Sequence, residues 1–355
     1  MFTVIAILVL AVLVFVHELG HFLAARWQGI RVHSFSLGFG PVLWQWQGKE
    51  VTYCVRAIPL GGFVSFPDDS EEETQDLLAH RPLGQRAIVM LAGVTANFIF
   101  AYLLLVIVAW QTGTQVLDQP GLRVLNYSYA NSPAAVAGIK PGDIILAVDD
   151  RDLGNGENII AEFQKEVARH KDQSMLLTIS RQGERLFLSV SPQGSPPRIG
   201  ILLDYAGRTI RQPFTNPLAV MQAAAVSFAN LCQITLQGLQ GLLTNFSETA
   251  KQLAGPVAIV ATGSRIAQSS WTELLNFAAI ISINLAIINL LPLPALDGGQ
   301  LLFLLLEALR GGNPLPKEIQ ENVMQGGLVV LLSLGMFMIF RDSYNLLQDY
   351  LEQIF

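Results

Sequence analysis

Residues 12–27 read VLVFVHELGHFLAARW and place His17, Glu18 and His21 inside a run that is otherwise almost wholly apolar. On an α-helix, side chains four residues apart lie one above the other, so His17 and His21 can share one metal ion. Imidazole nitrogens at this spacing suit Zn²⁺, and Glu18, on the neighbouring part of the same face, can deprotonate a zinc-bound water. Ionisable groups inside a membrane span are expensive and usually mark a site. The stretch therefore predicts a metal site on an apolar helix.

The composition indicates a membrane protein. Of the 355 residues, 51% are hydrophobic and only 14% are charged, whereas a soluble domain usually carries about 25% charged residues. The net charge is −6, and the absence of a basic stripe in the sequence argues against a nucleic-acid partner. Cys54 and Cys232 are the only cysteines, and their separation predicts small buried hydrophobes rather than a disulfide framework.

Four apolar segments are predicted to cross a hydrocarbon core of about 30 Å. They are residues 1–26, 87–110, 274–291 and the short stretch 326–340. A cleaved signal peptide is the alternative for the first, but its start, MFT, lacks a positive charge. The uncharged segment 217–246 has polar residues at helical spacing, which favours an interfacial or pore-lining helix and leaves a fifth span as the alternative.

Lysine and arginine near the span ends predict the orientation. The N-terminus before the first span has none, whereas the connection after it carries Arg26, Arg31, Lys49, Arg56, Arg81 and Arg86. The positive-inside rule then places this connection in the cytoplasm and the N-terminus outside. The acidic run 68–76, DDSEEETQD, is predicted to be a solvated loop.

A soluble module is predicted between the second and third spans, because the apolar runs shorten and turn residues appear from about residue 115 to 205. Its segment 132–150, SPAAVAGIKPGDIILAVDD, resembles the signature of a bacterial PDZ domain. The resemblance implies a groove where a peptide adds one strand to a sheet edge, and Gly121, Leu122 and Val124 are assigned to that groove. A spacer that keeps bulky substrates from the membrane site is the alternative.

A third metal ligand is expected from residues 289–300, NLLPLPALDGGQ. Asp297 is the only acid between Glu273 and Glu307, and it follows Pro292 and Pro294, which break the third span. Broken backbone at membrane depth is tolerated only where it is buried or lines a wet cavity. A lone carboxylate there needs a cation, and zinc held by the two histidines is the natural partner.

The two motifs together resemble the site-2 protease family of intramembrane zinc metalloproteases, in particular its RseP-type members. HELGH at 17–21 matches the family's HExxH, and residues 289–298 match its NxxPxPxLDG. The motifs, the spans and the inserted PDZ-like domain follow the family's order, although some RseP-type proteins have two PDZ domains.

The resemblance implies one zinc ion with His17, His21 and Asp297 as ligands and Glu18 as general base and acid. It also makes Asn289 the candidate for holding the substrate backbone or the developing oxyanion, with helix capping as the alternative. Asn97, in the second span, is assigned a contact with substrate.

A strand pair is predicted directly after HELGH. VLWQW at 42–46 and VTYCVRAI at 51–58 alternate in strand fashion around a turn at 47–49. The resemblance implies that this sheet dips into the membrane and pairs with an extended substrate through its edge. A cytoplasmic hairpin without a substrate role is the alternative.

We therefore expect a multi-pass α-helical membrane protein with a membrane-associated β-hairpin or sheet and one inserted PDZ-like α+β domain. The expected parts are the first span with HELGH at 1–26, the sheet connection at 27–86, the second span at 87–112, the PDZ-like domain at 113–205, an interfacial helical segment at 206–270, the third span with the LDG motif at 271–310, and the fourth span and tail at 311–355.

The predicted activity is zinc-dependent cleavage within or near the membrane helices of single-span proteins, in regulated intramembrane proteolysis. Family resemblance implies substrates such as anti-sigma factors or signal-peptide remnants, a peptide or C-terminal tail at the PDZ-like domain, and the lipid bilayer around the spans. The implied location is the bacterial cytoplasmic membrane, with the PDZ-like domain outside and the active site near the cytoplasmic side. A zinc protease that trims soluble tails at the membrane surface and a non-catalytic PDZ scaffold are the alternatives.

Overall fold

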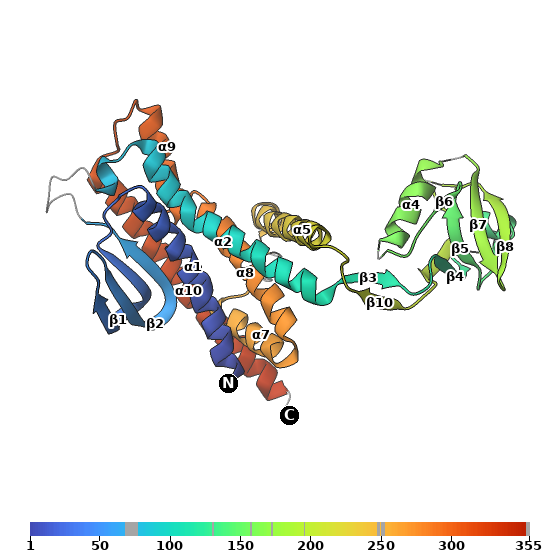
Figure 1. The fold of residues 1–355 in the computed structure, drawn as a ribbon, viewed down its shortest axis with the longest axis horizontal. Helices are drawn as coiled ribbons and strands as arrows, with labels where there is room; N and C mark the ends of the chain where they lie inside the picture. Colours follow the sequence, from blue (N-terminus) through green and yellow to red (C-terminus); the bar gives the residue numbers. More distant parts are fainter. Residues whose placement is uncertain are drawn as a thin grey trace. The chain divides into compact units, whose positions relative to one another are not determined.

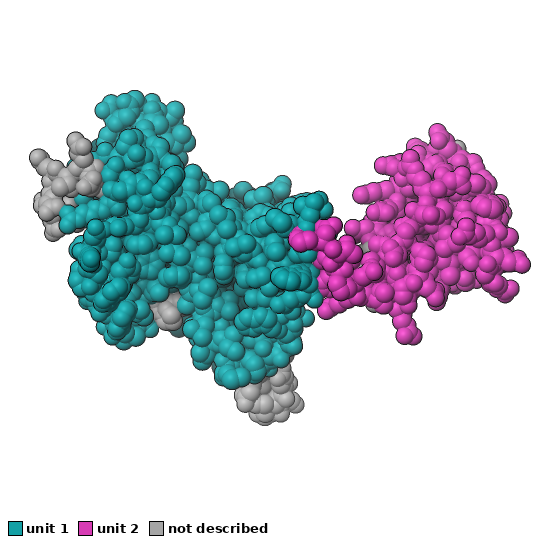
Figure 2. Space-filling model, in the orientation of Figure 1, with its two compact units in different colours: residues 1–111, 218–355 teal, residues 112–217 magenta. Residues whose placement is uncertain are grey.

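The computed structural model describes the whole chain except residues 68–76, 130, 157, 172, 195, 247, 248, 250–252 and 353–355. The chain divides into two compact units, shown in Figure 2: unit 1 comprises residues 1–111 and 218–355, and unit 2 comprises residues 112–217. The acidic run 68–76, predicted to be a solvated loop, lies outside the described residues.

Unit 1 is mainly helical (Figure 1). Within the described part of the chain, five helices are long and apolar enough to cross a membrane, one more than the sequence predicted. The additional one covers the segment for which an interfacial or pore-lining helix was favoured, and its length and hydropathy support the fifth-span alternative instead. The five are α1 (Phe2–Trp27), α2 (Leu83–Thr112), α5 (Pro217–Thr244), α8 (Trp271–Leu290) and α10 (Lys317–Glu352).

Among the described residues of unit 1, the shorter helices include the 3-10 turn η1 (Leu78–His80), α7 (Pro256–Ser269) and α9 (Asp297–Leu309). The predicted third span is therefore two helices, because α8 ends at Leu290 and α9 begins only at Asp297. Pro292 and Pro294 lie in the connection, where proline interrupts the helical hydrogen-bond ladder. The break places Asp297 in the first turn of α9.

Small residues allow the membrane helices to pack closely around α8. Ala278, Ala279 and Ala286 on α8 are buried, and the first two belong to a core cluster that also contains Ala101 and Leu105 of α2. Because lipid tails are as apolar as leucine, helices in a membrane associate through such close van der Waals contact. This packing brings α2 and α8 together around the HELGH-bearing helix α1.

The predicted strand pair is longer than expected and lies against α1 (Figure 1). It consists of β1 (Ser34–Gln47) and β2 (Thr52–Ser65). Residues 34–37 pair with both 52–55 and 62–65, and residues 42–47 pair with 52–56. The two bent strands therefore supply four extended segments, and residues 61–65 form one edge of the sheet. The predicted turn is present, since Gly48 N donates to Val51 O over 2.9 Å.

Unit 2 is a separate α+β unit, so the predicted fold class is confirmed. Its six-stranded sheet has the order β8-β7-β5-β4-β9, with β6 paired to β5, and β3 and β10 form a separate two-stranded ribbon. The strands are β3 (Thr114–Leu117), β4 (Leu122–Tyr127), β5 (Ile144–Val148), β6 (Arg151–Asp152), β7 (Met175–Arg181), β8 (Glu184–Val190), β9 (Ile201–Tyr205) and β10 (Thr209–Gln212). The helices are α3 (Pro133–Val136) and α4 (Ile159–Arg169).

An ion pair between the half-buried Arg181 and the buried Asp143 ties the KPGD turn of unit 2 to β7. The Arg181 guanidinium donates to both carboxylate oxygens of Asp143 over 2.7 Å, and Lys140 N donates to the same carboxylate over 2.7 Å. Burial raises the pKa of Asp143, but these hydrogen bonds outweigh it and the pKa lies below its ordinary value. The ionised form is therefore stabilised in the folded state.

We expect Asp143→Asn to destabilise unit 2 at pH 7, because Arg181 loses its carboxylate partner. Since the folded pKa of Asp143 is lowered, the contribution of the ion pair is complete above the unfolded pKa of about 3.9 and disappears as the pH falls through the folded pKa. Hydrogen exchange of the 112–217 peptides in the full chain, corrected for intrinsic rates, should show faster exchange in the variant at pH 7 and a shrinking difference below pH about 4. Equal exchange at pH 7 would contradict this role.

Candidate active site

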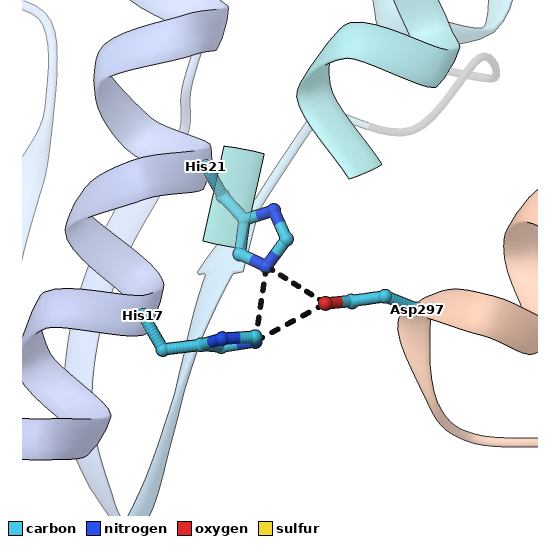
Figure 3. Close-up of side chains that lie close together, drawn as sticks. All are labelled: His17, His21 and Asp297. Carbon is cyan, nitrogen blue, oxygen red and sulfur yellow. Dashed lines mark hydrogen bonds and ion pairs between the residues drawn. The ribbon is translucent and has the colours of Figure 1, made fainter. Parts of the chain in front are cut away.

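Three side chains from distant parts of the sequence converge in unit 1 (Figure 3). His17 Nε2 lies 3.2 Å from His21 Nε2, and Asp297 Oδ2 lies 3.2 Å from His17 Nε2 and 3.3 Å from His21 Nε2. The histidines come from one face of α1, and the aspartate comes from the first turn of α9. Among the described residues, these three are the group of His, Cys, Asp and Glu side chains with the spacing of a metal site.

The geometry of this cluster fits a zinc ion. Tetrahedral ligands bound at 2.0–2.1 Å lie about 3.3 Å from one another. The observed separations of 3.2 and 3.3 Å match that value. Asp297 Oδ2 is buried and has no hydrogen-bond donor in the described part of the chain, as expected for an oxygen that serves a cation.

A glycine of α2 makes room for the two imidazole rings. A Cβ at Gly93 would lie 2.3 Å from His21 Nε2 and 2.8 Å from His17 Cε1, closer than van der Waals contact permits. Only a residue without a side chain lets α2 approach the histidines to this distance. The rings are therefore held from one side by the backbone of α2.

Glu18 lies in a cavity next to the cluster. The cavity has a volume of about 490 Å³ and is lined by the three cluster residues, Glu18, Asn289 and the segment 61–64 of β2, among others. The Val64 N–H donates a hydrogen bond to the Glu18 carboxylate, and a Cβ at Gly62 would lie 2.8 Å from Glu18 Cγ. The carboxylate thus stands between the cluster and the edge of the sheet.

The two asparagines selected from the sequence both lie beside His17. Asn289 Nδ2 is 3.3 Å from His17 Nε2, and Asn289 lines the cavity from the last turn of α8. Asn97 Nδ2 is 3.3 Å from the other ring nitrogen, His17 Nδ1, and the residue is 0% exposed. Asn97 also lines the cavity that contains Glu18, although its own surface is almost wholly covered, so the predicted substrate contact by Asn97 stays a prediction.

The predicted peptide groove at Gly121, Leu122 and Val124 is corrected. Leu122 and Val124 are buried in the core of unit 2, and their strand β4 has β5 on one side and β9 on the other. The backbone of Gly121 is occupied as well, since its N–H donates to Gly154 O and its carbonyl accepts from Ala206 N. An interior strand offers no free edge, and the edges of this sheet are β8 and β9.

Sequence reasoning missed Gly62, Val64 and Gly93. Gly93 was detectable in principle, because it lies four residues before Asn97 and so on the same face of α2. The contacts of Gly62 and Val64 with Glu18 depend on how β2 folds beside α1, for which the sequence gives no signal.

Comparison with known proteins places this chain in a family. The profile of Peptidase family M50 matches residues 5–334. The chain is 49% identical over 349 residues to the protein all3971 of Nostoc sp., which is named as a zinc metalloprotease, with 96% of this chain and 95% of that protein covered. It is 39% identical over 359 residues to "Membrane metalloprotease ARASP, chloroplastic" of Arabidopsis thaliana, covering 98% of this chain and 80% of that protein.

Among solved structures, the PDZ domain of the SdrC-like protein from Listeria monocytogenes is similar to 24% of this chain, with 90% of that domain covered, 18% identity and a TM-score of 0.22. The family assignment rests on the full-length matches, which include both the HELGH segment and the LDG segment. This chain belongs to peptidase family M50, the site-2 protease family, and is a membrane zinc metalloprotease.

Proposed function

We propose that the protein hydrolyses peptide bonds within or near the transmembrane helices of single-span membrane proteins, with zinc held by His17, His21 and Asp297. The observation that carries this proposal is the position of the cluster. Two of its residues lie within α1, the most apolar of the five candidate membrane helices, and the third lies at the start of α9, directly after the break that follows α8. A site at this depth is suited to a substrate that is itself in the bilayer.

The side chains around the cluster have complementary roles. His17, His21 and Asp297 would hold the zinc ion, which when bound would polarise the scissile carbonyl and lower the pKa of a bound water toward about 7. Glu18, beside the cluster in the same cavity, takes the proton of the attacking water and returns it to the leaving amine. The Asn289 amide donates a hydrogen bond to the carbonyl oxygen as negative charge develops on it.

The edge of the sheet offers a way to hold the substrate extended. A helical substrate keeps its peptide groups in its own hydrogen-bond ladder, so it has to unwind before attack. Residues 61–64 line the cavity, and the backbone of Val64 also contacts the Glu18 carboxylate. An unwound segment that pairs with this edge would place its backbone beside Glu18 and the cluster.

The location and partners follow from charge and topology. The basic residues between α1 and α2 favour a cytoplasmic position for that connection and an outside position for the PDZ-like unit 2 in a bacterial cytoplasmic membrane. In unit 2, the edge strand β9 lies beside α4 and is the position for a peptide or C-terminal tail. Shortened single-span proteins, such as anti-sigma factors or signal-peptide remnants, are the proposed substrates.

Mapping the cut tests this function. We would incubate the purified protein in detergent with a tagged single-span substrate and locate the products by mass spectrometry, with Glu18→Gln as the control for contaminating proteases. Cleavage inside or next to the apolar segment is the expected result. The cut should stay there when the soluble tail is shortened, because the site selects the membrane segment.

If the protein instead trims soluble tails at the membrane surface, the expected result differs. Its cut would lie in the soluble tail and would disappear when the tail is removed. That outcome would overturn intramembrane cleavage while leaving the zinc metalloprotease assignment intact.

A further inference from the structure

One face of α2 contacts both histidines of the cluster. Val89, Gly93 and Asn97 follow one another at intervals of four residues and so lie on the same side of the helix. Val89 supplies a carbonyl to His21, Gly93 supplies the space for both rings, and Asn97 supplies an amide to His17. All three residues are buried.

The contact with His21 fixes which nitrogen of that ring faces the cluster. His21 Nδ1 lies 2.8 Å from Val89 O, and a carbonyl can only accept a hydrogen bond. Nδ1 therefore carries the proton and donates it, which leaves the lone pair of Nε2 directed at His17 and Asp297. A metal-binding histidine is commonly oriented in this way by a carbonyl or carboxylate behind it.

Asn97 lies beside Nδ1 of His17, as the Val89 carbonyl lies beside Nδ1 of His21. The Asn97 backbone is fixed, because Ser282 Oγ on α8 donates to Asn97 O over 2.9 Å. Its side-chain nitrogen lies 3.3 Å from His17 Nδ1, while Asn97 Oδ1 is buried without a hydrogen-bond partner among the described residues. A buried amide oxygen without a donor is unfavourable by about 1–3 kcal/mol.

Metal binding by His17 would resolve this mismatch. When Nε2 gives its lone pair to a metal, the neutral ring carries its proton on Nδ1 and needs an acceptor there. The amide nitrogen of Asn97 cannot accept, but a half-turn of the amide group brings Oδ1 to the same position. Oδ1 then accepts a hydrogen bond from the Nδ1–H group and is no longer unpaired.

We propose that Asn97 is the positioning residue of His17: its side-chain oxygen accepts a hydrogen bond from the Nδ1–H group of His17 and so holds Nε2 toward the metal. The inference rests on the proposed zinc ligands and adds Asn97, a residue that lies outside both the HELGH motif and the LDG motif. Loss of such an outer partner typically weakens metal binding 10–100-fold. Asn97 is not one of the three ligands and acts through His17, so its effect is expected first on zinc affinity.

Zinc affinity of the full-length protein in detergent, measured by competition with a chromophoric chelator, tests the proposal. Asn97→Leu removes the acceptor at similar size and should bind zinc about 10–100-fold more weakly. Asn97→Asp keeps an acceptor oxygen and should restore affinity to within a few-fold of wild type. Asn284→Leu is the matched control, because Asn284 is an amide of α8 that accepts from Thr235 Oγ1 over 2.7 Å away from the cluster.

The absorption spectrum of the Co²⁺-loaded protein provides a second readout. If Asn97 served only the packing of the helices, its replacement would leave the visible bands unchanged. Asn97→Leu should alter the visible bands as His17 loses its orientation, and Asn97→Asp and Asn284→Leu should retain them. If Asn97→Leu is not recovered folded, Asn97→Ala removes the same acceptor with less bulk.

Two outcomes separate this inference from the function on which it rests. Unchanged zinc binding in His17→Ala would overturn the ligand assignment itself. Weak binding in His17→Ala together with wild-type binding in Asn97→Leu, or equal weakening in Asn97→Leu and Asn97→Asp, would overturn the role of Asn97 alone.

Discussion

Glu18→Gln should lower the rate of substrate cleavage by on the order of 10²–10⁴-fold while leaving zinc binding close to wild type. The carboxylate lies beside the cluster but does not belong to it, so the amide removes the proton acceptor and retains the three ligand atoms. Cleavage of a tagged single-span substrate and the zinc content of the same preparations are the measurements that check this.

Measuring zinc content distinguishes the loss of a general base from the loss of a metal ligand. His17→Ala provides the opposite pattern, in which zinc and activity are both lost. A Glu18→Gln protein that cleaves at the wild-type rate would show that another group takes the proton of water. A Glu18→Gln protein that has lost its zinc would show that Glu18 holds the site together instead.

Gly93→Ala should abolish zinc binding and cleavage together, although the substitution adds one methyl group. The new Cβ would lie 2.3 Å from His21 Nε2 and 2.7 Å from His21 Cε1, so the rings or the helix have to move. The clash is with the metal-facing ring nitrogen, so the ring cannot move aside without taking its ligand atom out of the cluster. We expect zinc affinity to fall at least as far as the 10–100-fold typical of a lost outer partner.

Gly84→Ala is the control for the second prediction. Gly84 also lies in α2, and a Cβ there meets nothing within 4 Å. Both substitutions replace glycine with a better helix former, so a loss of zinc binding in Gly93→Ala alone reports the contact with the histidines and not a weakened helix. Wild-type zinc affinity in Gly93→Ala would mean that the rings can turn away without losing the metal, contrary to the geometry described above.

The long apolar segments predicted from the sequence coincide with helices of the structure. The apolar runs identified α1, α2, α8 and α10, because the length of a membrane helix is set by the thickness of the bilayer. For segment 217–246 the polar residues at helical spacing favoured an interfacial helix, whereas the length and hydropathy of α5 favour the fifth span that was the alternative.

Predictions that required knowing which strands neighbour one another failed. Leu122 and Val124 were assigned to a peptide groove, but β4 lies inside the sheet with partners on both sides. Sheet order is a property of long-range pairing, and the local alternation of residues carries no information about which strand forms the edge.

By itself, the sequence determined the chemistry of the protein: two histidines at helical spacing, a glutamate beside them and an aspartate after a proline break form a donor set that only a cation makes tolerable in an apolar setting. Tertiary structure decided what surrounds that set. The approach of α2 through Gly93, the amide of Asn97 behind His17 and the sheet edge at Val64 beside Glu18 all join segments far apart in the chain. Their physical basis is close packing between elements, and even the regular spacing of Gly93 and Asn97 on α2 does not say which helix that face meets.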